Sequence, residues 1–167
     1  MLRPVYHQIL SHFGFTEQDD NTPWHKQSLP KSCIENDEAK ILWNIPIHLD
    51  IAPKNGANKP DITIMDKKTK TWLIIEGTVC NIGRITERDL QKTEKYIDLR
   101  TGLKRLYPNY NVVQVNVVLD FLAGYQKQLV TELSKIGLEK VNQLAKKCQK
   151  WIISQNCEIV KALYTRS

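Results

Sequence analysis

The chain has 167 residues, and its 24 lysines and arginines exceed its 18 aspartates and glutamates, for a formal net charge of +6. Hydrophobic residues make up 41% of the sequence, which is ordinary for a globular protein and predicts a single domain over residues 1–167. No apolar run approaches the ~18 residues of a membrane span, and the first residues lack the apolar core of a signal peptide. The positive charge favours a polyanionic partner, with nucleic acid as the first candidate.

The cysteines and histidines are scattered along the chain. None of them has the spacing of zinc ligands, and the sequence has no glycine-rich phosphate-binding loop. An intracellular, reduced setting is therefore expected. These residues are Cys33, Cys80, Cys148, Cys157, His7, His12, His25 and His48.

The N-terminal part is predicted to be two short helices joined by a loop. Apolar residues recur at helical spacing over residues 3–13. The polar, proline-containing stretch 16–33 predicts a loop, which Trp24 anchors to the body of the protein. Acids open the segment 35–43 and predict a second helix, because they complement the dipole of a first turn.

Residues 45–51 alternate apolar and polar side chains and predict a strand.

A β-hairpin is predicted where two segments rich in β-branched and aromatic residues, 59–65 and 71–78, flank a short polar run. With the turn at the middle of that run, Asp61 lies directly opposite Glu76 on one face of the strand pair. The same register places an apolar set on the other face, consisting of Ile62, Ile64, Leu73 and Ile75.

Two opposed carboxylates repel each other unless a cation lies between them. A hard divalent ion such as Mg²⁺ is bound by carboxylate oxygens, waters and substrate phosphates, so the pair of Asp61 and Glu76 is a candidate metal site. The acids of segment 35–43 could add a third carboxylate from Glu35. The ordinary alternative is a Pro-Asp turn at Asp61 and an exposed strand acid at Glu76.

A long helix is predicted over residues 85–107, ended by Pro108. One stripe of this helix changes from basic to apolar residues, namely Arg88, Lys92, Lys95, Leu99, Leu103 and Leu106. If the leucines pack on the sheet, Lys92 and Lys95 point toward the acid pair. In the alternative, both lysines belong to a solvated face.

The C-terminal part is predicted to contain one strand and two helices. Residues 112–119 have the apolar character of a buried strand, and the element order predicts a mixed sheet in which this strand runs parallel to an earlier one. Amphipathic helices follow within residues 125–164, divided by Gly137. The expected organisation is therefore an N-terminal helix and loop (1–33), a core of about 34–122, and C-terminal helices.

The ordered acids resemble the PD-(D/E)XK nuclease superfamily, in which a Pro-Asp pair is followed by an acid on the next strand. Here these positions are Pro60-Asp61 and Glu76, but Thr78 stands where the usual lysine would be. In some members the lysine comes from the following helix. Lys92-Thr93-Glu94-Lys95-Tyr96 is similar to the Lys-x-x-Lys-Tyr element of the restriction-like endonuclease domain of non-LTR retrotransposons.

The resemblance extends to retrotransposon-derived proteins of invertebrates and covers roughly residues 24–120. Two segments depart from the pattern: Leu119-Asp120-Phe121-Leu122, where small residues are usual, and Asn81-Ile82-Gly83, which replaces a polar turn. The segments that look alike are Glu35-Asn36-Asp37-Glu38, Ile41-Leu42-Trp43-Asn44, Ile47-His48-Leu49-Asp50, Lys59-Pro60-Asp61-Ile62 and Glu94-Lys95-Tyr96-Ile97-Asp98-Leu99.

The resemblance implies an α/β fold with a restriction-endonuclease-like mixed β-sheet core of about four strands, flanked by helices and followed by a helical C-terminal extension. It also implies a Mg²⁺- or Mn²⁺-dependent endonuclease that hydrolyses a DNA phosphodiester. The implied catalytic residues are Asp61, Glu76, Lys92, Lys95 and Tyr96. The implied metal ligands are Asp61, Glu76 and the carbonyl of Gly77, with Glu35 as a further candidate.

DNA is the implied partner, and the implied product is a nick with a 3′-hydroxyl end in a nuclear setting. In a full element this domain accompanies a reverse transcriptase and a zinc knuckle. Two alternatives stay open: a nuclease fold that binds nucleic acid without catalysis, and a structure-selective nuclease like a junction resolvase, which acts as a two-fold dimer. The expected DNA contacts are Arg84, Arg88, Lys59, Lys67 and Lys68.

Overall fold

The computed structural model describes residues 1–15, 29–124 and 127–164, so the predicted role of Trp24 lies outside the described residues. The elements in chain order are α1 (Arg3–His12), β1 (Cys33–Glu35), β2 (Ala39–Trp43), β3 (Ile62–Asp66), β4 (Thr71–Cys80), the 3-10 turn η2 (Ile82–Arg84), α2 (Ile85–Lys95), α3 (Ile97–Leu106), β5 (Asn111–Asp120), α4 (Lys127–Ser134) and α5 (Val141–Tyr164).

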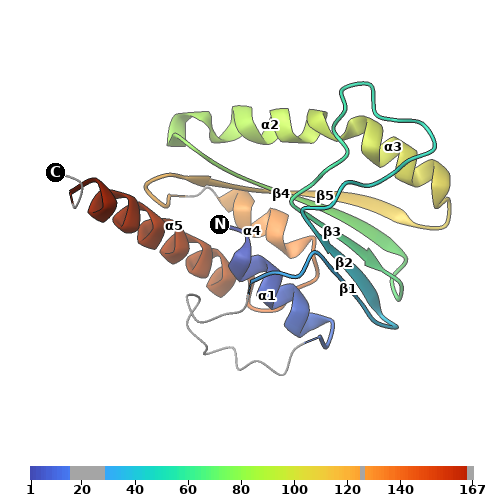
Figure 1. The fold of residues 1–167 in the computed structure, drawn as a ribbon, viewed down its shortest axis with the longest axis horizontal. Coiled ribbons are helices and arrows are strands. Elements are labelled where there is room, and N and C mark those ends of the chain that lie inside the picture. Colours follow the sequence, from blue (N-terminus) through green and yellow to red (C-terminus); the bar gives the residue numbers. More distant parts are fainter. Residues whose placement is uncertain (16–28, 125–126, 165–167) are drawn as a thin grey trace.

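A five-stranded mixed sheet forms the centre of the fold (Figure 1). The strands lie in chain order, and the first four pair antiparallel with their neighbours. The last strand, β5, pairs in parallel with β4, and the connection between them runs through α2 and α3. The predicted mixed sheet and its parallel last strand are therefore confirmed, with five strands where about four were expected.

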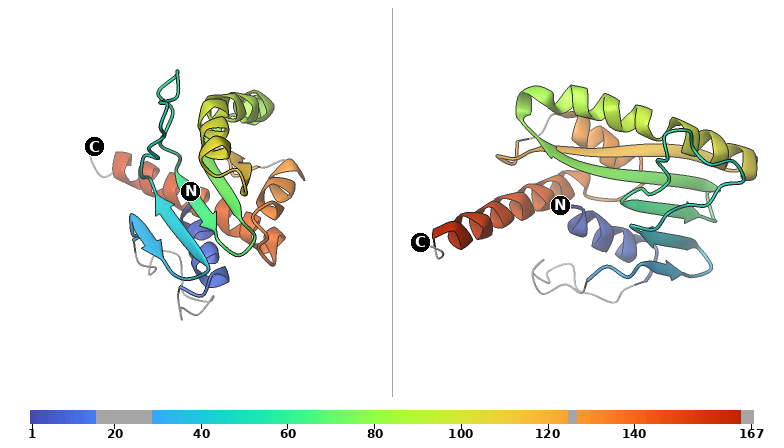
Figure 2. Two further views of the ribbon diagram at one scale, coloured as in Figure 1. Left: turned by 90° about the vertical axis from the view of Figure 1, so that its right-hand side faces the viewer. Right: turned by 45° about the horizontal axis from the view of Figure 1, so that its top comes forward.

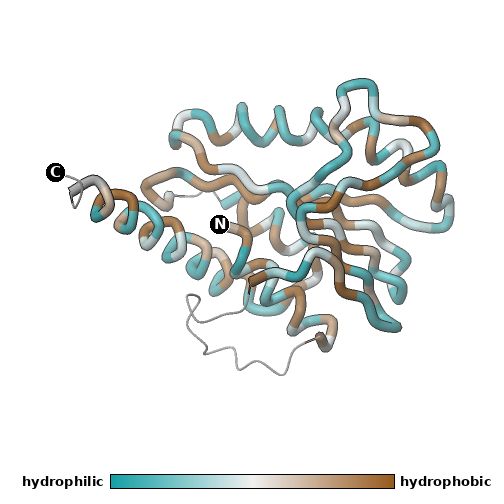
Figure 3. Tube along the Cα trace, viewed as in Figure 1, coloured by the Kyte–Doolittle hydropathy of each residue, from teal (hydrophilic) through white to brown (hydrophobic). Residues whose placement is uncertain are grey.

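Helices cover both faces of this sheet, as the two views in Figure 2 show. α2 and α3 lie on one face, and α1, α4 and α5 lie on the other. Alternate strand residues point to opposite faces, so each layer has its own hydrophobic cluster. Leu73 and Ile75 belong to the cluster under α1, α4 and α5, whereas Ile74 packs with Leu99 and Leu103 of α3. Figure 3 shows the apolar stretches along the strands and the mostly hydrophilic α2.

The helix predicted for residues 35–43 is wrong, because this segment forms the turn and second strand of a hairpin. Asn36 makes the turn, since its side-chain oxygen accepts hydrogen bonds from the backbone N–H groups of Glu38 and Ala39. Asparagine stabilises turns in this way. After the turn, β2 pairs with β3, and Ile41 is fully buried in the larger cluster.

The strand predicted for residues 45–51 is also wrong. The chain leaves β2 at Asn44, which has a φ of 54°, and the segment that follows is irregular. Ile47 is nevertheless buried, and Leu49 is partly buried, in the cluster on the α3 side of the sheet, whereas Ile51 is exposed. Apolar alternation therefore indicated burial only for the middle of the segment, where the packing partner is a helix rather than a neighbouring strand.

The predicted helix 85–107 is two helices that meet at Tyr96, whose φ of −106° and ψ of 17° interrupt the α-helical backbone. The interruption changes the predicted stripe, because Leu99 and Leu103 are buried but Leu106 is 41% exposed. The C-terminal helices are present, and Gly137, with a φ of 79°, lies between them. No described helix, α5 included, is long and apolar enough to cross a membrane.

Candidate functional site

The predicted register of the β3–β4 hairpin is confirmed, since Ile62 pairs with Ile75 and Ile64 pairs with Leu73. One step beyond the last pair, Asp61 and Glu76 meet at the end of the hairpin. The backbone N–H of Asp61 donates to Glu76 Oε2 at 3.3 Å, and the N–H of Gly77 donates to Asp61 Oδ2 at 2.8 Å. The two acids are therefore held together by hydrogen bonds from the backbone N–H groups of Asp61 and Gly77.

Lys92 and Lys95 reach the same acid pair from α2. Lys92 Nζ lies 2.7 Å from Glu76 Oε1, and Lys95 Nζ lies 2.9 Å from the same oxygen. The side chain of Glu76 is only 4% exposed, whereas those of the lysines are 23% and 40% exposed. The prediction that these lysines point toward the acids is confirmed, and the alternative of a purely solvated pair is excluded.

Tyr96 completes the surroundings of Glu76. The break between α2 and α3 turns this residue inward, where it is fully buried. Its hydroxyl lies 2.9 Å from Glu76 Oε2 and 3.1 Å from the carbonyl oxygen of Lys59. The interruption of the helix contributes to the site, because it brings a fourth hydrogen-bond donor to the Glu76 carboxylate.

Polar side chains of β5 hold α2 in this position. Gln114 donates to the carbonyl oxygen of Lys92 at 2.7 Å. Asn116 donates to Thr93 Oγ1 at 2.8 Å and to Asp89 Oδ1 at 2.9 Å. Both β5 residues are buried, and buried amides that are hydrogen-bonded in this way fix the position of a helix. The lysine positions therefore depend on a rigid support.

The two acids have opposite pKa shifts. Burial tends to raise the pKa of Glu76, but hydrogen bonds and charge from Lys92 and Lys95 outweigh it and lower the pKa overall. Burial raises the pKa of Asp61, the N–H of Gly77 opposes this, and the neighbouring charge of Glu76 adds to the rise. Burial and the negative charge of Glu76 raise the pKa of the Tyr96 hydroxyl. The surroundings of Glu76 therefore favour its ionised form, whereas ionisation of Asp61 costs free energy in the folded protein.

A divalent cation would find three oxygen-bearing groups here, the carboxylates of Asp61 and Glu76 and the carbonyl of Gly77. The N–H and C=O groups of one strand residue point to the same side, and the N–H of Gly77 bonds to Asp61. Among the described residues, no group of three or more histidines, cysteines, aspartates and glutamates could hold a metal. A bound cation would therefore need waters or phosphate oxygens as its remaining ligands, as Mg²⁺ usually does.

Other predicted site residues lie elsewhere. Glu35 forms ion pairs with Lys40 and Lys67 near the β3–β4 turn, which is the opposite end of the hairpin from Asp61 and Glu76. Lys68 lies in that turn and is exposed. The structure therefore does not bring Glu35, Lys67 and Lys68 to the acid pair.

The remaining predicted DNA contacts lie at the start of α2 and just before β3. Arg84 and Arg88 are at the start of α2, where Arg84 forms an ion pair with Glu87 at 2.9 Å and Arg88 donates to Gln91 at 2.8 Å. Lys59 is exposed and precedes the Pro60-Asp61 pair. Arg84 and Arg88 thus share a helix with Lys92 and Lys95, and Lys59 is close in sequence to Asp61.

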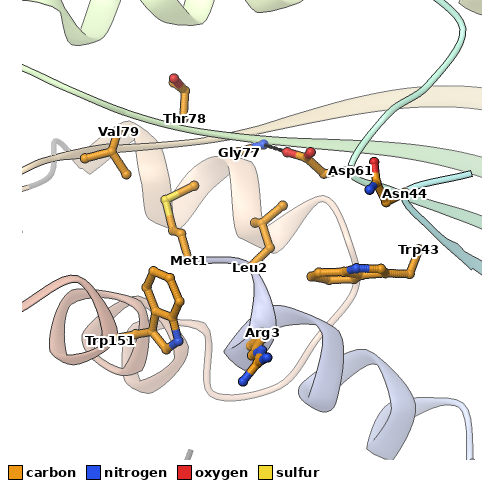
Figure 4. A pocket seen from close by; sticks show the side chains of 10 residues that line it. All are labelled: Met1, Leu2, Arg3, Trp43, Asn44, Asp61, Gly77, Thr78, Val79 and Trp151. Carbon is orange, nitrogen blue, oxygen red and sulfur yellow. Dashed lines mark hydrogen bonds between the residues drawn. The ribbon is translucent and has the colours of Figure 1, made fainter. Parts of the chain in front are cut away.

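The sequence did not indicate a cavity of about 530 Å³ beside Asp61 (Figure 4). Its walls come from five parts of the chain: the start of α1, the end of β2, the residue before β3, the second half of β4 and α5. The lining residues are Met1, Leu2, Arg3, Trp43, Asn44, Asp61, Gly77, Thr78, Val79 and Trp151. No local motif marks such a set, because only the packing of α1 and α5 on the sheet brings its members together.

Comparisons with protein-family models, with curated proteins and with solved structures found no match to this chain.

Proposed function

We propose that this protein is a metal-dependent DNA endonuclease with a restriction-endonuclease-like core that hydrolyses a phosphodiester bond. The observation that carries the proposal is the meeting of Asp61 and Glu76 at the end of a hairpin, with Lys92 and Lys95 on the same carboxylate. Opposite shifts of the two carboxyl pKa values are typical of catalytic sites, where environments separate the protonation of neighbouring groups.

In this proposal, Asp61, Glu76 and the carbonyl of Gly77 hold Mg²⁺ or Mn²⁺. When bound, the ion polarises the phosphate and lowers the pKa of a bound water. The usual lysine of the superfamily is absent, because Thr78 occupies its position. Lys92 or Lys95 can take its role, because both contact Glu76 from α2. Their ammonium groups neutralise Glu76 and are placed to orient a water or to offset charge on a phosphate oxygen. Tyr96 fixes the Glu76 carboxylate through its hydroxyl.

DNA is the proposed substrate. Arg84 and Arg88 are exposed cations at the start of the helix that carries Lys92 and Lys95, and Lys59 precedes Pro60-Asp61. Phosphate contacts by such cations would provide affinity without reading base sequence. The proposed product is a nick that leaves a 3′-hydroxyl end, made in the nucleus. In a longer element, such a nick would supply the primer for a reverse transcriptase.

A second candidate is a nuclease fold that binds nucleic acid without cutting it. One observation favours it: Glu76 accepts hydrogen bonds from four groups, two of them ammonium groups. A divalent ion would compete with these donors for the same oxygens. A structure-selective nuclease like a junction resolvase would share the chemistry of the first candidate and differ in its substrate and in acting as a dimer.

Nicking of supercoiled plasmid DNA tests the proposal. In Mg²⁺ or Mn²⁺ the protein is expected to convert supercoiled plasmid to the open circular form, and EDTA is expected to stop the reaction. Asp61→Ala is expected to lower the rate by about 10³-fold or more, because a catalytic metal ion contributes several kcal/mol to the barrier. Gel electrophoresis of the plasmid forms over time measures this rate.

Asp37→Ala is the matched control, because Asp37 is an exposed acid in the β1–β2 turn, away from the acid pair. Its rate should equal that of the wild-type protein. Plasmid binding that is sensitive to salt, together with no cutting by any of the three proteins, would favour the second candidate. Preferential cutting of four-way junctions would point to the resolvase-like activity instead.

A further inference from the structure

The second half of β4 has an open edge. β3 pairs only with the first half of β4, residues 71–75, whereas β5 pairs with its full length. Beyond that point, no described strand covers the β3-side edge of β4, and the cavity beside Asp61 lies there. Gly77 allows Met1 and Leu2 to pack closely against this part of β4, because a Cβ atom at residue 77 would collide with their side chains.

Two tryptophans form opposite sides of this cavity. Figure 4 shows Trp43 and Trp151 on either side, with Met1 and Leu2 between them. Both indoles are partly exposed, although each also packs against the hydrophobic core. The T-shaped contact with Tyr6, at 5.1 Å between ring centroids, helps to hold Trp43 in place. A flat aromatic ligand could therefore stack on an indole that is already positioned.

The polar groups of the cavity suit a base that is attached to a phosphate backbone. Asn44 and Arg3 lie at its borders. An asparagine amide can hydrogen-bond the edge of an unpaired base, and an arginine can contact a phosphate or stack on a base. Asp61 belongs both to the cavity and to the acid pair. A phosphate at the acid pair would thus place the base of the same or an adjacent nucleotide at the mouth of the cavity.

We propose that this cavity binds the base of an unpaired nucleotide next to the scissile phosphate, and that the protein therefore prefers DNA with single-stranded or unpaired positions. The proposal deepens the proposed nuclease function and rests on it for the position of the phosphate. Continuous duplex would have to extrude a base to fill the cavity, which costs unstacking and unpairing energy. Single strands avoid that cost and gain a stacking contact that does not depend on sequence.

The test measures binding without metal, so that it is independent of cutting. A short single-stranded oligonucleotide carrying the fluorescent base 2-aminopurine is titrated with wild-type protein in EDTA, and the same sequence is titrated as a duplex. The single strand is expected to bind on the order of 10-fold more tightly and to change its fluorescence on stacking. dAMP, a free nucleotide, is expected to bind far more weakly, because it lacks the backbone contacts.

Two variants alter the cavity by different means. Trp151→Leu removes a stacking surface, and Val79→Phe fills space beside it, where Val79 is 43% exposed and has room for a larger side chain. Each is expected to weaken single-strand binding on the order of 10-fold and to leave duplex binding unchanged. Phe121→Leu, at an exposed aromatic residue outside the cavity, is the matched control and should bind as the wild type does.

Several results would overturn the inference. Equal affinity for single strand and duplex would do so, as would single-strand binding that both cavity variants leave unchanged while their circular dichroism shows folded protein. Tight binding of dAMP alone would assign the cavity to a free nucleotide instead. Failure of the nuclease proposal would appear separately, as absence of plasmid nicking in Mg²⁺ while this base binding in EDTA persists.

Discussion

Replacing Glu76 by glutamine is expected to lower the free energy of unfolding by about 2 kcal/mol and to abolish plasmid nicking. Glutamine has nearly the same shape but no charge, so two ammonium groups would remain within reach of each other without their carboxylate. Breaking a fully buried ion pair costs about 3–5 kcal/mol. The cost should be smaller here, because Lys92 and Lys95 are 23% and 40% exposed and water screens them.

Urea unfolding at several pH values measures this effect. The pKa of Glu76 is lowered in the folded protein, so its ionised form stabilises the fold above the pKa of an unfolded glutamate, which is about 4.3. That stability is lost as the pH falls through the lowered folded-state pKa, and the difference between wild type and Glu76→Gln should disappear there. Glu94→Gln, at an exposed acid on α2, the helix that carries Lys92 and Lys95, should show no such difference at neutral pH.

Replacing Asp61 by asparagine is expected to have the opposite effect on stability. The variant should be more stable than the wild type at neutral pH, on the order of 1 kcal/mol, and should lose plasmid nicking by about 10³-fold or more. Burial and the charge of Glu76 disfavour an ionised Asp61. Asparagine removes that charge but keeps an oxygen that can accept the hydrogen bond from the N–H of Gly77.

The sign of this effect can be checked by pH. Because the folded-state pKa of Asp61 is raised, its ionisation costs stability above that pKa, and the cost disappears as the pH falls through it. The stability gain of Asp61→Asn should therefore be present at neutral pH and vanish in acid. If Asp61→Asn instead destabilises the protein at neutral pH, the carboxylate is a structural group, and its placement reflects folding rather than catalysis.

The hairpin and its acids could be predicted because their determinants are local. A polar turn between two β-branched segments fixes the register, and the register alone opposes Asp61 to Glu76. The stripe placed Lys92 and Lys95 correctly although its leucines belong to α3, beyond the break at Tyr96, because α2 and α3 lie on the same face of the sheet. The presence and direction of β5 followed from the need for a long crossover between parallel strands.

The errors have tertiary causes. Residues 35–43 begin with acids that resemble the first turn of a helix. The segment instead forms a turn and a strand, because Asn36 hydrogen-bonds the turn and β2 pairs with β3. Residues 45–51 alternate like a strand, yet the segment pairs with no strand, and its Ile47 and Leu49 pack in the cluster beside α3. No proline or glycine near Tyr96 marks the helix break in the sequence. The break is stabilised by the hydroxyl bond to Glu76, which is visible only after the hairpin and helix are packed together.

Calorimetric titration of the protein with Mn²⁺ tests most directly whether the acid pair is a metal site. We expect the wild-type protein and Asp37→Asn to bind Mn²⁺, and Asp61→Asn and Glu76→Gln not to bind it, although Asp61→Asn should be at least as stable as the wild type. Carboxylate oxygens are what such an ion requires of this site. No binding to the wild type, or equal binding to Asp61→Asn, would contradict the account.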